Sequence, residues 1–287
     1  MNIQWYPGHM AKAKRKIMEE LKLVDIAIEL LDARIPISSR NPEVDEIVGN
    51  KKRIIVLNKS DISDPQLNIE WKKYFEQKGI TPILANAAKG TGLKDILKES
   101  KNLMKDELEI LKKKGLKHKT IRGLVIGIPN VGKSTLINKL ANRSIAQTGD
   151  RPGVTKSKQW IKVNEDFELL DTPGILWPKF DDERIGLNLA FTGAIKDEIL
   201  DIEELARKFI LKALKDFPDK LYKRYNVELE EDSDVETIIN RIGRKRGCIL
   251  PGNEVDTNRA AAMILDDFRS GRIGLITLEK PEDILLN

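Results

Sequence analysis

Cysteine, histidine and long hydrophobic runs are scarce in this chain of 287 residues. Its single cysteine, Cys248, excludes an intramolecular disulfide and a cysteine-built zinc site. Its two histidines, His9 and His118, argue against a metal centre built from histidine. No apolar run approaches the ~18 residues that span a bilayer, and residues 1–16 lack the apolar stretch of a secretory signal. We therefore expect a soluble cytoplasmic protein that has no membrane partner.

The charged residues are unevenly divided along the chain. Residues 1–174 hold 32 basic and 22 acidic side chains, whereas residues 175–287 hold 18 basic and 23 acidic ones. The basic residues concentrate at 12–16, 112–122 and 241–246. Such clusters are compatible with a polyanionic partner, and equally with solvated helix ends and linkers.

The pattern of apolar residues changes near residue 178. Before residue 174, apolar β-branched runs alternate with helical patterns, which is typical of a mostly parallel sheet flanked by helices. The expected strands are 23–31, 53–57, 80–85, 121–126, 159–163 and 166–170, and the expected helices are 64–78, one or two from 93, and 133–142. Only helical patterns follow Pro178, at about 183–195, 203–216, 235–246 and 257–269. We expect an α/β domain over 1–178, with a short basic N-terminal segment, and a mainly helical domain over 179–287.

A glycine-rich stretch with the pattern G-x-x-x-x-G-K-S occupies residues 127–134, between an expected strand and an expected helix. Glycines let the backbone wrap phosphate groups with its N–H groups inward, and the helix N-terminus adds partial positive charge. Lys133 would then reach the β- and γ-phosphates, and the Ser134 hydroxyl would be a ligand of Mg²⁺. The alternative is a glycine turn that only caps the helix. The strand-loop-helix context favours a nucleotide site, with contacts from Asn130, Val131, Gly132, Lys133, Ser134 and Thr135.

A second motif, Asn58-Lys59-Ser60-Asp61, follows the expected strand 53–57 and is typical of a guanine reader. The Asp61 carboxylate can accept hydrogen bonds from guanine N1–H and N2–H₂. Adenine lacks both donors, and the loss of such hydrogen bonds can disfavour it by roughly 10⁴-fold relative to guanine. The stem of Lys59 can lie over the base, and Asn58 can tie this loop to the phosphate loop. A backbone N–H of the Asn86-Ala87 loop can reach guanine O6. Because Asn and Asp are common in turns, the tetrad alone is weak evidence for a guanine site. Together with the phosphate loop it is strong evidence.

A third motif, Asp171-Thr172-Pro173-Gly174, follows the expected strand 166–170. Asp171 can hold Mg²⁺ through water, and the Gly174 N–H can bond the γ-phosphate. Thr155 can supply a second hydroxyl to Mg²⁺, or it is an ordinary turn threonine. Segments ordered by γ-phosphate and Mg²⁺ are released on hydrolysis, so these residues predict a switch.

The order of these motifs is unusual. The tetrad at 58–61 and the loop at 86–87 precede the phosphate loop and the D-x-x-G motif, whereas in common GTPases they follow them. The same sheet forms if the usual chain ends are joined within 93–120 and the chain is cut just after Gly174. We therefore expect a P-loop GTPase domain with a circularly permuted motif order.

The sequence resembles the circularly permuted GTPases of ribosome biogenesis, specifically the bacterial YlqF/RbgA type, over nearly the whole chain. The resemblance is carried by residues 5–10 (WYPGHM), 32–36 (DARIP), 58–61, 127–134, 171–178 (DTPGILWP) and 252–279. It implies a GTPase that acts late in assembly of the large (50S) ribosomal subunit and is stimulated by that subunit. It also implies a helical C-terminal domain that binds ribosomal RNA. The ligands would be GTP or GDP with Mg²⁺, the partner would be the subunit precursor, and the protein would be a monomer.

The residue after Gly174 bears on catalysis. Ras-like GTPases orient the attacking water with a glutamine after D-x-x-G, whereas this chain has the apolar Ile175. It resembles GTPases with a hydrophobic substitution there, so His9 is the leading catalytic candidate, because histidine can position or polarise water near neutral pH. A turn histidine or an RNA contact is the alternative. Asn130 resembles the asparagine by which some such GTPases bind K⁺, or it is a solvent-facing loop residue.

Two other functions are considered beside a GTP-hydrolysing assembly factor. One is a GTP-gated RNA-binding module in which hydrolysis is incidental, and the strength of stimulation by the large subunit separates it from an assembly GTPase. The other, an ATP-driven P-loop enzyme, conflicts with the tetrad at 58–61.

Overall fold

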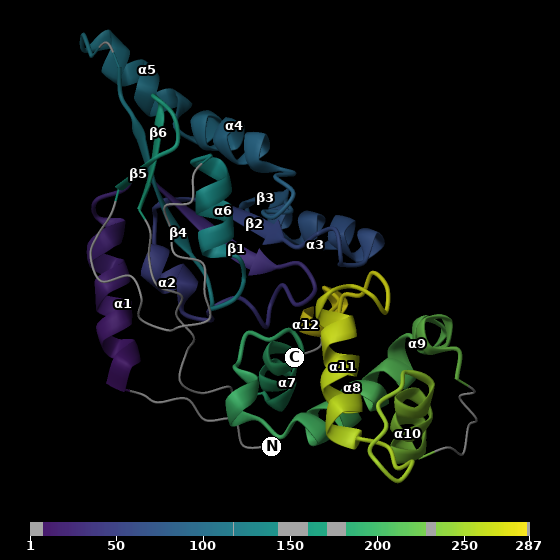
Figure 1. Ribbon diagram of the computed structural model, residues 1–287. Coiled ribbons are helices and arrows are strands. Elements are labelled where there is room, and N and C mark those ends of the chain that lie inside the picture. The colour runs from purple at the N-terminus through teal and green to yellow at the C-terminus, as the bar shows by residue number, and fades with distance from the viewer. Residues whose placement is uncertain (1–7, 117, 143–159, 171–181, 228–233, 286–287) are drawn as a thin grey trace. The chain divides into compact units, whose positions relative to one another are not determined.

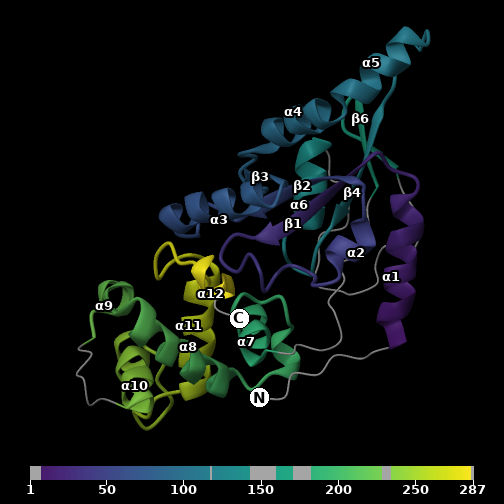
Figure 2. The ribbon, with the colours of Figure 1, turned by 180° about the vertical axis from the view of Figure 1, so that it is seen from behind.

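The computed structural model of the chain describes residues 8–116, 118–142, 160–170, 182–227 and 234–285 (Figure 1). The chain divides into two compact units. The first unit is made of Met1–Glu183 together with Thr277–Asn287, and the second is made of Arg184–Ile276. Figure 2 shows the sheet of the first unit from behind.

The first unit is built on a six-stranded sheet in the order β3-β2-β1-β4-β6-β5. Neighbouring strands are parallel, except that the edge strand β5 is antiparallel to β6. The strands are β1 Ile26–Asp32, β2 Lys52–Asn58, β3 Thr81–Leu84, β4 Ile121–Ile126, β5 Trp160–Lys162 and β6 Phe167–Leu170. The predicted α/β class, with a mostly parallel sheet, is therefore confirmed.

Helices connect and cover these strands. In the first unit they are α1 Gly8–Leu21, α2 Val44–Val48, α3 Pro65–Gln77, α4 Leu93–Leu103, α5 Lys105–Lys113, α6 Lys133–Leu140 and α12 Glu282–Leu285. The start of α3 follows from its sequence, because Asp64 caps the N–H groups of Gln66 and Leu67 and Pro65 fits the first turn. Helix α1 was not predicted, since the N-terminal part of the chain was expected to be only a short basic segment.

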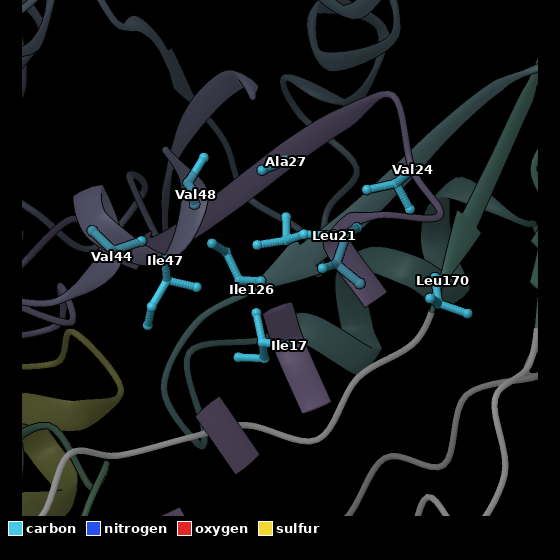
Figure 3. Close-up of a cluster of buried hydrophobic side chains, with 10 residues drawn as sticks. Ile17, Leu21, Val24, Ala27, Val44, Ile47, Val48, Ile126 and Leu170 are labelled. Atoms are coloured by element: carbon cyan, nitrogen blue, oxygen red, sulfur yellow. The ribbon is translucent and has the colours of Figure 1, made fainter. Parts of the chain in front are cut away.

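Strand β1 is buried along its whole length and lies in the interior of the sheet. In the cluster drawn in Figure 3, Ile17 of α1 and Ile47 of α2 are buried together with Ala27 of β1. A second cluster joins the ends of β1 and β2 to Trp71 and Phe75 of α3. Covering of this kind explains why the strands are near-continuous apolar runs in the sequence.

The second unit is helical. Its elements are α7 Glu183–Phe191, the 3₁₀ turn Asp197–Ile199, α8 Ile202–Asp216, α9 Pro218–Tyr225, α10 Val235–Lys245 and α11 Thr257–Arg269. Its core contains the rings of Phe191, Phe209 and Phe268, with Phe209 and Phe268 centred 4.8 Å apart. Asp267 on α11 accepts hydrogen bonds from Arg224 and Tyr225 and so ties α9 to α11. Within the described ranges, no helix has both the length and the hydrophobicity that a membrane crossing requires.

The last residues of the chain correct the expected division. Residues 179–287 were all assigned to the helical domain, but residues from Thr277 onward belong to the first unit. The reason is a set of hydrogen bonds: Leu278 N donates to the Arg34 carbonyl, and Trp71 Nε1 donates to the Glu279 carbonyl. The second unit is therefore an insertion in the first, with both of its ends continuing into that unit.

Trp71 provides a test of this core. It is fully buried, whereas Ile69 on the same helix is half exposed. Replacing a buried tryptophan with alanine removes apolar contacts and leaves a cavity, which costs about 3–5 kcal/mol of unfolding free energy. We expect Trp71→Ala to lose that amount in urea unfolding followed by circular dichroism, and Ile69→Ala to stay within about 0.5 kcal/mol of the parent protein. Equal effects of the two changes would contradict the assignment of the core.

Candidate nucleotide-binding site

The expected motif residues meet at the carboxyl edge of the sheet. Asp32 ends β1 and pairs in register with Asn58, which ends β2, while Gly127 follows the end of β4 on the other side of β1. The chain runs outward from β1 to β2 and β3 and then returns to place β4 against β1. Loops that leave neighbouring strands in opposite directions open a crevice at such a point, where open α/β sheets bind their ligands.

The phosphate loop runs from Gly127 to Gly132 and opens into α6. Two of its residues have left-handed backbone angles, with φ of 58° at Asn130 and 103° at Gly132. The Lys133 side chain is 8% exposed, and its Nζ donates to the carbonyls of Gly127 and Ile128 at 3.1 and 2.6 Å. The first N–H groups of α6 have no intrahelical partners, which is the usual basis of anion binding at a helix N-terminus.

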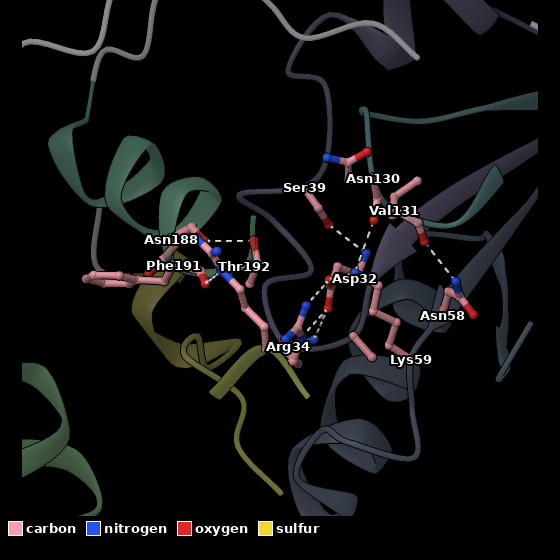
Figure 4. Close-up of polar contacts among 12 residues, drawn as sticks. Asp32, Arg34, Ser39, Asn58, Lys59, Asn130, Val131, Asn188, Phe191 and Thr192 are labelled. Atoms are coloured by element: carbon pink, nitrogen blue, oxygen red, sulfur yellow. Dashed lines mark hydrogen bonds and ion pairs between the residues drawn. The ribbon is translucent and has the colours of Figure 1, made fainter. Parts of the chain in front are cut away.

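Asn58 connects three loops with one side chain. Its Nδ2 donates to the Val131 carbonyl at 2.8 Å (Figure 4). Its Oδ1 accepts the Ala87 N–H at 2.9 Å. Asn58 is 3% exposed. The expected contact between Asn58 and the phosphate loop is therefore present, and the same amide also holds the loop after β3.

Lys59 lies next to the phosphate loop in the left-handed region, with φ of 62°. Its Nζ donates to the Asn130 carbonyl at 3.1 Å and forms an ion pair with Asp32 at 2.9 Å (Figure 4). Asp32 also accepts two hydrogen bonds from the Arg34 guanidinium, at 2.9 and 2.7 Å. Burial alone would raise the pKa of Asp32, but the charges of Arg34 and Lys59 hold that pKa well below its usual range.

Sequence reasoning gave Asp32 and Arg34 no role, although both lie in the DARIP stretch that contributes to the family resemblance. Their spacing of two residues at a strand end was the available signal. The missing information was the pairing of β1 with β2, which places Lys59 beside Asp32.

The loops that carry Asp61 and Asn86 also lie together. Lys89, in the loop after β3, pairs with the Asp61 carboxylate at 3.2 Å. Ser60 is fixed against the same region, because its N–H and hydroxyl both donate to the Ala85 carbonyl. Asn86 is buried, and its Oδ1 accepts the Lys89 N–H, so this side chain shapes the loop. The Asp61 carboxylate is about one third exposed, so a ligand can reach it.

The metal ligands expected from the sequence are only partly described. Ser134 lies in the first turn of α6, and Thr135 follows it. A hydroxyl oxygen at this place suits Mg²⁺, which prefers hard oxygen ligands. Thr155, Asp171 and Gly174 lie outside the described residues. In the ranges that the structure covers, no three Asp, Glu, His or Cys side chains gather into a metal site.

The catalytic candidate His9 lies in the first turn of α1, and its side chain is outside the described part of the structure. Its expected role therefore remains a prediction.

The basic clusters differ in how their charges are used. Lys14 of the first cluster pairs with Glu43 at 3.3 Å and with Glu46 at 3.5 Å. The second cluster begins on α5, a helix that buries none of its residues, and ends at Arg122, whose guanidinium lies 4.8 Å from the Trp160 ring centre. The lysines at the end of α5 are exposed and form a basic surface: Lys112, Lys113 and Lys114.

The third cluster lies at the C-terminal end of α10. Arg244, Lys245 and Arg246 are exposed, and each donates to a backbone carbonyl within the second unit. Arg246 also lies over the Tyr225 ring, 5.4 Å from its centre. The charges are thus held in place on the surface of the second unit.

Comparison with known proteins identifies the family. A family model described as "50S ribosome-binding GTPase" matches residues 122–244. Ribosome biogenesis GTPase A of Bacillus licheniformis is 50% identical over 284 residues, which cover 99% of this chain and 100% of that protein. The chain belongs to the ribosome biogenesis GTPase A family. The family resemblance stated from the motifs is confirmed, and the protein is a ribosome-biogenesis GTPase that binds and hydrolyses GTP.

Solved structures agree with this assignment to the ribosome biogenesis GTPase A family. A GDP-bound YlqF has a TM-score of 0.68 at 27% identity, covering 94% of this chain and 100% of that one. A GNP-bound YlqF from T. maritima has a TM-score of 0.64 at 28% identity, covering 94% and 99%. The match to the family model starts in β4, after the tetrad at 58–61, as the permuted motif order requires.

Gly132 allows a test of the contact between the loops. A Cβ at this position would lie far inside van der Waals contact with Asn58 Nδ2, and the φ of 103° is itself unfavourable for an L side chain. We expect Gly132→Ala to weaken GDP and GTP-analogue binding at least about tenfold in calorimetry, or about 1.4 kcal/mol. Gly79→Ala is the matched control, because Gly79 also has positive φ but open space around its Cβ position. Unchanged binding in the Gly132 variant would show that the close approach is unimportant.

Proposed function

We propose that this GTPase acts late in maturation of the large (50S) ribosomal subunit and that binding to the subunit precursor stimulates its turnover. The observation that supports GTP binding in this proposal is the joining of the phosphate loop to the loop at 58–61 by Asn58. The family model described as "50S ribosome-binding GTPase" supports the choice of the large subunit. A factor of this kind works where subunits are assembled, in the cytoplasm, and we propose that it does so as a monomer.

At the base end of the site, Asp61 accepts the two N–H donors of guanine and the Lys59 stem covers the ring. The Ala87 N–H donates to Asn58 and so serves the link between the loops. We therefore assign the contact with guanine O6 to the next amide along the chain, that of Ala88. Asn86 contributes by shaping this loop rather than by touching the base.

At the phosphate end, the N–H groups of residues 130–135 and the Lys133 ammonium surround the β- and γ-phosphates. Ser134, Thr155 and Asp171 would hold Mg²⁺, which neutralises charge that develops on these phosphates. The Gly174 N–H would contact the γ-phosphate. The carbonyls of Gly127 and Ile128 accept hydrogen bonds from Lys133 Nζ and so hold its ammonium group against the phosphate loop.

We assign ribosomal RNA binding to the second unit together with the basic surface at the end of α5. Arg244, Lys245 and Arg246 are exposed and oriented by backbone carbonyls, which limits the freedom that they lose on meeting phosphates. Acidic residues outnumber basic ones over 175–287, so the interaction depends on these local clusters rather than on net charge.

Asp61→Ala tests the choice of base. The variant loses both acceptors for guanine, so we expect GTP affinity to fall by at least about 100-fold while ATP affinity changes little. Competition against a fluorescent guanine nucleotide measures both affinities. Asp95→Ala, on the first turn of α4, is a control at an acidic residue outside the site. Retention of the parent preference for GTP over ATP would refute the assignment of Asp61.

His9→Ala tests catalysis. If His9 places the attacking water when the subunit docks, turnover stimulated by large subunits falls by about 10²-fold or more, whereas GTP affinity is retained. Single-turnover hydrolysis, with and without isolated large subunits, measures this. His118→Ala is the control histidine. Absence of stimulation in the parent protein would instead favour a GTP-gated RNA-binding module.

Asn130 is proposed as a K⁺ ligand beside the β/γ bridge of the nucleotide. Its backbone carbonyl already accepts from Lys59, and its left-handed conformation sets the shape of the loop. We expect hydrolysis to be several-fold faster in K⁺ than in Na⁺ at equal ionic strength, because a bound monovalent cation adds positive charge near the developing negative charge. Asn130→Ala should remove the difference. Equal rates in both salts for the parent protein would exclude this role.

A further inference from the structure

The segment Thr277–Glu279, here called the C-terminal clasp, returns from the second unit and binds one loop of the first unit. Leu278 N donates to the Arg34 carbonyl at 2.7 Å. The Thr277 hydroxyl accepts the Asp64 N–H at 3.0 Å and lies 3.4 Å from the Ala33 carbonyl, to which it donates. The clasp therefore contacts the backbone immediately after β1 and the N-cap of α3.

Glu279 makes the densest of these contacts. Its carboxylate accepts the N–H groups of Ile37 and Ser38 at 2.8 and 3.0 Å and the Ser38 hydroxyl as well. Its backbone carbonyl accepts the Nε1 of the buried Trp71 at 3.2 Å. Successive N–H groups turned toward one carboxylate form an anion-binding nest, so this loop is ordered around Glu279.

The same loop begins with the residues that hold Lys59. Arg34 is 1% exposed, and its guanidinium binds both oxygens of Asp32. Asp32 in turn pairs with Lys59, whose Nζ also reaches the Asn130 carbonyl. The clasp therefore binds the backbone of Arg34, while the side chain of Arg34 takes part in fixing the lysine beside the base.

We propose that the C-terminal clasp is a working part of the guanine-nucleotide site, with Glu279 as a positioning residue for Lys59. It holds the loop 33–38, Arg34 of this loop binds Asp32 at the end of β1, and Asp32 pairs with Lys59, whose stem covers the base. The inference rests on the proposed base-reading role of Lys59 and adds a dependence on residues more than 200 positions away in the chain. Because such coupling is reciprocal, bound nucleotide must also stabilise the clasp.

The test uses the full chain with Glu279→Ala and Glu279→Gln, and with Glu282→Ala as the matched control. Glu282 is an exposed acid three residues further on that pairs only at the surface with Lys280. Stopped-flow release of fluorescent GDP and of a fluorescent GTP analogue gives the dissociation rates. We expect Glu279→Ala to speed release of both nucleotides by about five- to tenfold, Glu279→Gln to have a smaller effect, and Glu282→Ala to have none. Equal effects on both nucleotides exclude an effect confined to the γ-phosphate, which only the GTP analogue carries.

A double-mutant cycle separates positioning from general loss of structure. In a Lys59→Ala background, Glu279→Ala should have little further effect on release, because the group that it positions is already absent. Amide hydrogen exchange at Ile37 and Ser38 reports the clasp directly, and GDP should slow it in the parent protein. The proposal is overturned if Glu279→Ala exposes these amides without changing nucleotide release, or if the two substitutions are additive. A parent protein that binds ADP as well as GDP would instead refute the proposed base-reading site itself.

Discussion

The candidate nucleotide site depends on the hydrogen bonds of one side-chain amide, that of Asn58. It donates to the phosphate loop and accepts from the loop after β3, so the loops that follow β2, β3 and β4 share one buried group. A buried amide that is satisfied in this way has one preferred orientation, because a flip would leave a donor facing a donor and an acceptor facing an acceptor. An aspartate at this position could not donate to Val131, and a leucine could bond neither loop.

Much of the first unit could be predicted because its signals are local. Short β-branched runs gave the six strands, and Asp64-Pro65 gave the start of α3 to within a residue. The contact of Asn58 with the phosphate loop could be expected as well, since both follow strands whose carboxyl ends share an edge. The four-residue spacing of Ala13, Ile17 and Leu21 is a helical pattern that also marks α1, but the surrounding lysines suggested only a basic segment.

The remaining features depend on pairings that no local pattern records. The role of Asp32 needs the register that sets β1 beside β2, and the use of the Ala87 N–H needs the position of Asn58. The return of Thr277 to the first unit joins residues over 200 positions apart, such as Glu279 and Ser38. The sequence of neither stretch indicates that it contacts the other. A boundary drawn from a change in the apolar pattern therefore missed where the helical insertion ends.

The close approach of Gly132 to Asn58 has a consequence for the kinds of molecule that the protein can retain. Lys59 also reaches the Asn130 carbonyl, so the two ends of the site are built as one piece with a set spacing between them. We expect such a site to select ligands by their length. Free guanine or inorganic phosphate can satisfy one end only, whereas a nucleotide spans both and gains the advantage of a linked, bivalent ligand.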